Sequence, residues 1–114
     1  MDDFFVRNGL WYKQFTDVPF TGEITGKRQG SIKNGKKDGA WVYYSDSGQI
    51  VRKGNWKNGH KEGAWVSYDK GGQVGLKGNY KNGKMEGVWV GYNKDGTVFK
   101  PLTGTFKGGK KISD

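Results

Sequence analysis

Cysteine is absent from this chain of 114 residues, and histidine occurs once, at position 60. Thiol chemistry is therefore excluded, and cysteine usage says nothing about the redox compartment. A zinc site needs several Cys or His ligands, and no second imidazole or thiol is present to complete one around His60. We expect His60 to be a surface turn residue, and we expect the chain to bind no metal and no cofactor.

Long apolar stretches are missing as well. No run is long enough to span a membrane, and the start of the chain lacks the charged and apolar segments of a secretion signal. A cytoplasmic location is therefore favoured for the chain as given. Only 32% of the residues are apolar, but 15% are aromatic, which distinguishes the chain from disordered polar sequences. The 21 glycines follow no Gly-X-Y period, which excludes collagen.

Acidic residues are few relative to basic ones. Twenty Lys and Arg against eleven Asp and Glu give a net charge of +9 and a pI near 9.7. Such an excess favours contact with anionic partners, or it keeps a sheet-rich protein soluble. The total charge does not decide between the two.

Internal repetition is the main feature that is present. Lys-Asn-Gly occurs at 33–35, 57–59 and 81–83, so 57 − 33 and 81 − 57 both give a period of 24 residues. The pattern Gly-x-Trp-Val-x-Tyr recurs with it, at 39–44, 63–68 and 87–92. A repeat protein buries its apolar surface between neighbouring units, so this periodicity predicts the architecture of the whole chain.

Turn signals within the repeat predict hairpins. Asn-Gly suits both central positions of a type I′ turn, which need positive φ. Four-residue turns with glycine are predicted at 45–48, 69–72 and 93–96. Each unit then has two strands of about eight residues. We predict an all-β fold: one elongated, twisted antiparallel meander over residues 1–114, with a modified N-terminal cap at 1–30, about three repeats at 31–100 and a C-terminal cap at 101–114.

The predicted turns also set a register between the strands. Counting outwards from them places Trp41, Arg52, Trp65, Leu76, Trp89 and Lys100 in one transverse row. The next row on the same face would hold Gly30, Gly39, Gly54, Gly63, Gly78 and Gly87, and beyond it would come Ile32, Lys37, Trp56, Lys61, Tyr80 and Met85. In the first row we expect Arg52 to stack on tryptophan. Tryptophan rings can lie over glycines that have no side chain, so we predict that Trp41, Trp65 and Trp89 make this the packed face.

The other face is predicted to be the more polar one and the more available to partners. The register places Val42, Val51, Val66, Val90 and Phe99 in one row there. The next row would hold Tyr44, Gln49, Tyr68, Gln73 and Tyr92. We take Tyr44, Tyr68 and Tyr92 as candidate partner-binding residues.

Both ends of the chain depart from the period. The rings of Phe4, Phe5, Phe15 and Phe20 give the N-terminal segment enough apolar area to fold over the first strand or an open face. Near the other end, Phe106-Lys107-Gly108-Gly109 imitates the hairpin marker after a shift of two residues around Pro101. Proline cannot donate a ladder hydrogen bond, so an edge or a bulge is expected there.

The repeat resembles that of the MORN family, in its longer bacterial form. The matching pattern is Gly-x-Trp-x-x-Tyr, a turn with glycine, and then Gly-x-Tyr-Lys-Asn-Gly-Lys, which fits 39–61 and 63–84 and, with a two-residue insertion, 87–110. The segments 7–12 and 19–22 are similar to the leading part of YwqK-type antitoxins of bacterial or phage origin. The resemblance implies a curved sheet used for binding or scaffolding, and neutralisation of a partner protein. It implies no catalytic residue, and it keeps acidic phospholipids open as ligands.

Carboxylates at repeat spacing are the nearest approach to a catalytic site. Asp38, Glu62 and Glu86 recur 24 residues apart, but each stands among lysines of the Asn-Gly turns. Balancing the charge of the turns is the favoured role, ahead of acid and base catalysis. We therefore predict no catalytic residue and no enzymatic activity.

Lysines gather at the Asn-Gly side of the predicted sheet. The candidate partner-binding residues there are Lys33, Lys36, Lys37, Lys57, Lys61, Lys81, Lys84 and Lys107, followed by Lys110 and Lys111. Our first hypothesis is a protein-binding module, antitoxin-like or inhibitor-like, that contacts an acidic protein. The second is a binder of nucleic acid or acidic phospholipid, and the third is a structural scaffold whose lysines only prevent aggregation.

Overall fold

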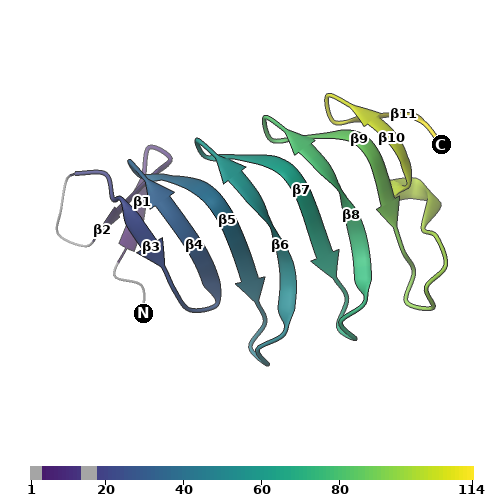
Figure 1. Cartoon of the computed structure of the whole chain (residues 1–114), viewed down its shortest axis with the longest axis horizontal. Coiled ribbons are helices and arrows are strands. Elements are labelled where there is room, and N and C mark those ends of the chain that lie inside the picture. Colours follow the sequence, from purple (N-terminus) through teal and green to yellow (C-terminus); the bar gives the residue numbers. More distant parts are fainter. Residues whose placement is uncertain (1–3, 14–17) are drawn as a thin grey trace.

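The fold is a single long sheet with a small hairpin beside it (Figure 1). A computed structural model describes residues 4–13 and 18–114. The hairpin consists of β1 (Phe4–Arg7) and β2 (Leu10–Lys13). The nine-stranded sheet consists of β3 (Gly22–Ile24), β4 (Arg28–Lys33), β5 (Lys36–Tyr44), β6 (Ile50–Lys57), β7 (His60–Tyr68), β8 (Val74–Lys81), β9 (Lys84–Gly91), β10 (Gly104–Lys107) and β11 (Lys110–Ser113). A short 3₁₀ helix, η1 (Lys100–Leu102), precedes β10.

The strands follow one another in space as they do in the sequence, and all pairs are antiparallel. The prediction of an all-β, elongated meander of hairpins is therefore confirmed. The molecule measures 48 × 33 × 17 Å, so the sheet is one layer thick over most of its length. No helix in the described part of the chain is long and apolar enough to cross a membrane.

The turns have the predicted geometry. Asn58 and Gly59 have φ of 52° and 82°, and the other two Asn-Gly pairs repeat these values closely. The glycines that close the opposite turns, Gly48, Gly72 and Gly96, also have positive φ. Asn8 and Gly9, with φ of 53° and 76°, form the same turn between β1 and β2. The Asn-Gly signal was present there too, although the sequence analysis did not use it to predict that hairpin.

The register follows the predicted one only for the first few pairs after each Asn-Gly turn, and at the four-residue turns it differs from the first pair, since Tyr68 pairs with Val74 and not with Gln73. Next to the turn, Trp56 pairs with Lys61, as predicted, but Gly54 then pairs with Trp65. Gly63 and Ala64 lie between the paired residues of β7 and have no counterpart on β6. Equivalent irregularities interrupt β4 against β5 and β8 against β9. This β-bulge shifts the pairing by two residues, and the positive φ of 76° at Gly63 shows why glycine is needed there.

The shift makes the two predicted rows wrong. Tryptophan and glycine alternate in a single row: Gly30, Trp41, Gly54, Trp65 and Gly78 in direct succession, with Trp89 opposite Gly104. Arg52 and Leu76 pair with Tyr43 and Gly91 in the neighbouring row, and Lys100 lies in η1, outside the sheet. Gly39, Gly63 and Gly87 do not lie under rings, because they are the bulge residues and nothing lies near the position of a Cβ.

The predicted packing of rings on glycine is confirmed, with different partners. A Cβ at Gly54 would lie inside the indole of Trp65, and Gly30 and Gly78 have the same relation to Trp41 and Trp89. Each indole N–H also donates to a backbone carbonyl, at 2.9 Å from Nε1 of Trp65 to the oxygen of Asn55. Trp41, Trp65 and Trp89 are 0%, 4% and 1% exposed. We call this side of the sheet the aromatic face.

The other side carries no comparable row of rings. Its central row alternates valine and lysine, with Val42, Lys53, Val66, Lys77 and Val90 in direct succession. The predicted row of Val42, Val51, Val66, Val90 and Phe99 is wrong for the same reason of register. So is the predicted row of tyrosine and glutamine, since Tyr44 pairs with Ile50 and Tyr68 with Val74. We call this side the valine–lysine face.

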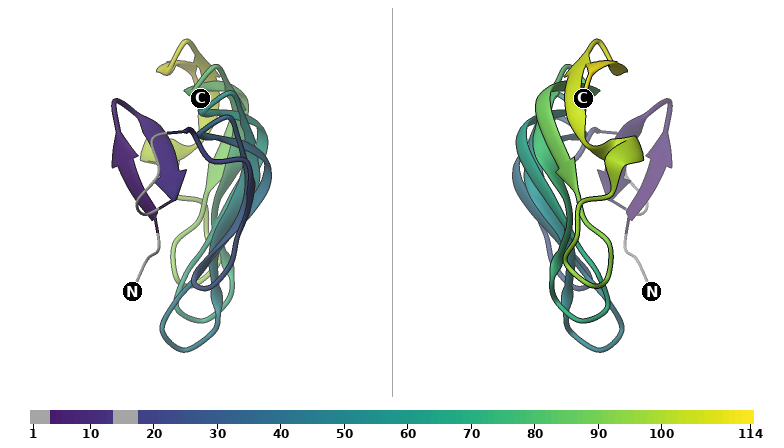
Figure 2. Two further views of the ribbon diagram at one scale, coloured as in Figure 1. Left: turned by 90° about the vertical axis from the view of Figure 1, so that its left-hand side faces the viewer. Right: turned by 90° about the vertical axis from the view of Figure 1, so that its right-hand side faces the viewer.

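The N-terminal hairpin folds onto the aromatic face, as predicted for the ring-rich cap. The N–H of Trp11 donates to the carbonyl of Gly35 at 2.7 Å, and the ring of Trp11 lies 6.3 Å from that of Trp41. Phe4 packs against Phe20 with 4.7 Å between ring centres. Phe5 stacks on Tyr12 instead, and Phe15 lies outside the described residues. Figure 2 shows the hairpin and η1 on the same side of the sheet.

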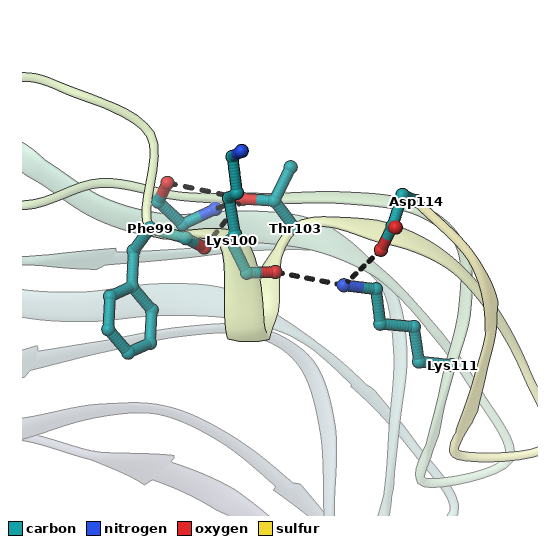
Figure 3. A network of polar contacts seen from close by, with 6 residues as sticks. Phe99, Lys100, Thr103, Lys111 and Asp114 are labelled. Carbon is teal, nitrogen blue, oxygen red and sulfur yellow. Dashed lines mark hydrogen bonds and ion pairs between the residues drawn. The ribbon is translucent and has the colours of Figure 1, made fainter.

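The C-terminal cap is irregular around Pro101, as predicted, but the irregularity is a 3₁₀ helix. Pro101 lies within η1 and belongs to no strand edge or bulge. The hydroxyl of Thr103 donates to the carbonyl of Phe99, and the ammonium of Lys111 donates to the carbonyl of Lys100 and pairs with Asp114 (Figure 3). Gly108 and Gly109 then replace Asn-Gly in the turn between β10 and β11, with φ of 57° and 89°.

Candidate functional site

Lysines face one another across four successive turns along one long side of the sheet. Two-residue turns put the flanking residues directly opposite each other, which pairs Lys33 with Lys36, Lys57 with His60, Lys81 with Lys84, and Lys107 with Lys110. All eight side chains are exposed. The turns follow the upper side of the sheet in Figure 1. We call these eight residues the lysine edge.

Equivalent turns repeat every second strand, which corresponds to about 9.5 Å along the edge. The edge is therefore a regular line of positive charge with His60 as its one exception. Its regularity follows from the turn type, because type I′ turns fix which residues stand opposite each other. The predicted gathering of lysines at the Asn-Gly side is correct for these seven.

Lys37 and Lys61 lie on the aromatic face, as the predicted row beyond the glycines placed them, although both had also been counted with the lysines of the Asn-Gly side. The alternation of side chains along a strand turns each of them to the same side as the tryptophans. The Nζ of Lys37 lies 4.8 Å from the ring centre of Trp41 and 4.6 Å from that of Trp56, and it donates to the hydroxyl of Tyr43 at 2.8 Å. The Nζ of Lys61 lies 5.0 Å from the rings of Trp65 and Tyr80. Both lysines are half-buried.

The three predicted carboxylates bind to the Asn-Gly side turns, and they do so through backbone N–H groups. Asp38 and Glu62 accept hydrogen bonds from the N–H groups of Asn58 and Asn82, each in the turn of the next repeat, at 3.4 and 3.0 Å. Glu86 accepts from Gly108 at 3.3 Å. Among the described residues, none of the three forms an ion pair with a lysine of the edge. The seven lysines of the edge therefore outnumber the three carboxylates at these turns, and an excess of positive charge remains.

Rings enclose the lysines of the aromatic face in a repeated arrangement. The ring of Trp65 lies flat on the sheet. The rings of Trp56 and Tyr80 stand almost perpendicular to the Trp65 ring, with interplanar angles of 83° and 84°. Lys61 occupies the space above Trp65 between these rings. We call this a ring box: a flat tryptophan, flanking rings and one filling side chain.

The arrangement is modified in the other two repeats. In the first, Lys37 lies over Trp41, and the neighbouring rings of Trp11 and Tyr43 are tilted to Trp41 at 52° and 32°. Met85 has the equivalent position in the third, where Tyr80 and Phe106 stand at 82° and 72° to Trp89. Met85 is half-buried and packs against the core. Lysine stems and methionine have similar apolar lengths, so both can line the same walls.

Positive charge collects at the centre of the aromatic face. The guanidinium carbon of Arg52 lies 4.5 Å from the ring centre of Tyr43, one strand away from Lys61. Burial lowers the pKa of Lys61 below its ordinary value, and the like charges of Arg52 and Lys37 lower that pKa further. Burial also raises the pKa of Tyr80. The nearby rings act in the opposite sense on Lys61, since their negative faces favour an ammonium ion.

The tyrosines proposed as partner-binding residues lie at the ends of strands on the valine–lysine side of the sheet. Tyr44, Tyr68 and Tyr92 are partly buried, and each pairs with an aliphatic residue beyond the turn. An open hollow of about 550 Å³ lies between two of these turns, with Tyr68, Ile50 and Asp69 in its lining. The side chains that line the hollow include both acidic and basic ones, so the lining does not favour a ligand of one charge.

Two parts of this surface were not predicted from the sequence. Trp56 and Tyr80 were placed beyond the glycines without a role, and Arg52 was expected to stack on tryptophan. The usable signal was the spacing of 24 residues between Trp56 and Tyr80, which matches that between Lys37 and Lys61. The bulge that brings these sets together has no sequence signature apart from glycine itself.

Nothing in the described residues suggests a metal centre. No three His, Cys, Asp or Glu side chains lie close enough to hold an ion in the ranges 4–13 and 18–114. His60 lies exposed on the lysine edge, as expected for a turn residue. Comparisons with protein-family models, curated proteins and solved structures find no match to this chain.

Proposed function

We propose that the protein is a non-enzymatic binding module that contacts an acidic protein through its lysine edge, in the manner of an inhibitor or antitoxin. One observation carries this proposal. Eight basic or imidazole side chains stand exposed in facing pairs along four turns, and no described carboxylate pairs with them. A line of excess positive charge attracts a partner of opposite sign, raises the association rate and fixes the partner's orientation.

The rest of the fold supports a binding role over a catalytic one. The hydrogen-bonded turns and the row of rings provide a rigid surface, which lowers the entropy lost on binding. The resemblance of the repeat to the MORN family points in the same direction, since it implies a binding or scaffolding sheet. The similarity of segments 7–12 and 19–22 to YwqK-type antitoxins suggests a toxin as the partner.

Affinity capture with the full chain as bait tests this function. A variant with Lys33, Lys57, Lys81 and Lys107 changed to glutamine removes one lysine from each pair and leaves every turn residue in place. Its control changes Lys53, Lys70, Lys77 and Lys94, which are also exposed and lie away from the edge. We expect an acidic protein to be retained by the wild type and the control and to be lost by the edge variant. Equal retention by all three would show that the edge serves only solubility.

A second candidate function is binding to a polyanion, and the regular spacing of the edge is what favours it. Phosphates of nucleic acid or of acidic phospholipid require only a line of positive charge. In that case the edge variant would lose binding to duplex DNA, RNA or acidic vesicles, and wild-type binding would weaken steeply between low and moderate salt. Weak binding without steep salt dependence would leave the protein partner as the better proposal.

A further inference from the structure

The two ends of the aromatic face are covered, and its centre is open. The N-terminal hairpin is hydrogen-bonded to Gly35 at one end. At the other end, the N–H of Gly91 donates to the hydroxyl of Thr103, just after η1, at 2.9 Å. Both covers lie on the same side of the sheet (Figure 2). Between them, β6, β7 and β8 make extensive contacts only with their neighbours in the sheet, and Arg52 is exposed.

Within residues 4–13 and 18–114, no ion pair joins the cations at this centre to a carboxylate. Arg52, Lys37 and Lys61 are held by rings and by the hydroxyl of Tyr43. In the described part of the chain, every carboxylate is engaged elsewhere: Glu23 with Ser31, Asp38, Glu62 and Glu86 with turn N–H groups, Asp46 with Lys27, Asp69 and Asp95 within their own turns, and Asp114 with Lys111.

The half-buried charges of Lys37 and Lys61 are electrostatically unfavourable without a counter-charge, and an anion placed between Lys61 and the exposed guanidinium of Arg52 would stabilise them. The lowered pKa of Lys61 is consistent with this. A guanidinium next to an ammonium suits a carboxylate well, because arginine can donate two parallel hydrogen bonds to it.

We propose that Arg52 and Lys61 form a docking site for a carboxylate-bearing segment of the acidic partner, with Trp56 and Tyr80 as its walls. The inference rests on the proposed function and assigns the partner a second contact, on the aromatic face. Nucleic acid fits the site less well. Base stacking needs open ring faces, whereas the face of Trp65 lies on the glycine strand and under Lys61, and Trp65 is only 4% exposed.

Titration of the ¹⁵N-labelled full chain with a hexaglutamate peptide tests the site. We expect the indole N–H signals of Trp56 and Trp65 and the Nε–H signal of Arg52 to shift together. The variant Arg52→Gln with Lys61→Met keeps the stems that cover the rings, and Lys61→Met copies the third repeat. We expect it to weaken binding about tenfold, as the loss of two charge-assisted contacts predicts.

Two matched variants separate this site from general attraction. Lys53→Gln with Lys77→Gln removes the same charge from the valine–lysine face, and Lys57→Gln with Lys81→Gln removes it from the lysine edge. Each should weaken peptide binding only about twofold, through net charge. An equal loss in all three variants, or no shift of the aromatic-face signals, would overturn the site. So would tighter binding of a short oligothymidylate at the same signals.

The captured partner distinguishes this inference from the function on which it rests. If the edge variant loses that protein while Arg52→Gln with Lys61→Met retains it at full affinity, the docking site is wrong and the proposed function stands. If the aromatic-face variant loses it about tenfold and the edge variant does not, the docking site is supported and the edge is not the contact. Retention by both variants would overturn both proposals.

Discussion

The two faces of this sheet are built from the same strands but have opposite energetic roles. On the aromatic face, Trp41, Trp65 and Trp89 are almost fully buried without a second layer above most of them. On the valine–lysine face, Val42, Val66 and Val90 stay partly exposed, and Val88 is 66% exposed. Most domains bury apolar surface between two layers. Here the rings lie down on glycine and are covered by neighbouring rings and lysine stems, so one layer supplies its own core.

The largest difference in stability between variants of the two faces is predicted at two adjacent residues. Trp65→Ala should lower the free energy of unfolding by roughly 3–5 kcal/mol, because it removes a buried ring and the hydrogen bond to Asn55. Val66→Ala, one residue later on the other face, should cost about 1 kcal/mol or less. Urea unfolding followed by circular dichroism measures both. Equal costs would mean that the valine–lysine face is as important for stability as the aromatic one.

A smaller effect is expected from adding one methyl group. Gly54→Ala places its Cβ inside the indole of Trp65, so the ring must lift and stability should fall by roughly 2–3 kcal/mol. Gly75→Ala is the matched control, since Gly75 also lies in a strand and its added Cβ would meet the nearest atom, the carbonyl oxygen of Ser67, at 3.8 Å. The control should be neutral or slightly stabilising. A neutral Gly54→Ala would contradict the role of the glycine row.

These glycines also show how far the sequence predicts the fold. Periodicity and Asn-Gly turns were enough to predict the meander, the strand lengths, the turn geometry and the burial of Trp41, because each depends on local spacing. The register was wrong because a strand glycine such as Gly63 can have either of two structural roles. A glycine in a strand can lie beneath a ring, as Gly54 does, or form a bulge, and the pattern of residues alone does not distinguish them.

The candidate site was partly wrong for a different reason. Lys57 and Lys81 flank turns, so their exposure on the edge follows directly from the sequence. Lys61 lies one residue further from the turn, where alternation directs it to the other face, and a count of lysines near the turn does not show this. The turn arithmetic had, however, placed Lys61 in one row with Trp56 and Tyr80, and the pairing of Trp56 with Lys61 is confirmed.

A third prediction compares the ring box that holds Lys61 with the one that holds Met85. Burial and like charges lower the pKa of Lys61, so the folded state disfavours its charged form. The unfolded chain therefore binds the proton more tightly, and the penalty is fully present below the folded-state pKa. As the pH rises through that pKa towards the ordinary value of 10.5, the penalty disappears.

Lys61→Met should accordingly raise stability at neutral pH by less than about 1 kcal/mol, because much of the ammonium remains in solvent. The loss of the cation–π contacts is offset by contacts between sulfur and the rings, as for Met85. The gain should shrink above neutral pH in unfolding curves recorded at a series of pH values. Met85→Leu, which leaves the charge unchanged, should show no such trend. A gain that stays constant up to alkaline pH would argue against a buried-charge penalty.

The smallest effect is predicted at Trp56, which stands upright beside a flat tryptophan. The indole Nε1 of Trp56 is buried and has no hydrogen-bond partner, whereas that of Trp65 donates to Asn55. Trp56→Phe keeps an upright ring and removes the unpartnered donor, so stability should change by less than about 0.5 kcal/mol, while Trp65→Phe should cost about 1–2 kcal/mol. The difference between the two variants isolates the hydrogen bond from the ring. If Trp56→Phe proves as costly as Trp65→Phe, the wall of the ring box depends on the full width of the indole, and the site at Arg52 and Lys61 should be measured again in that variant.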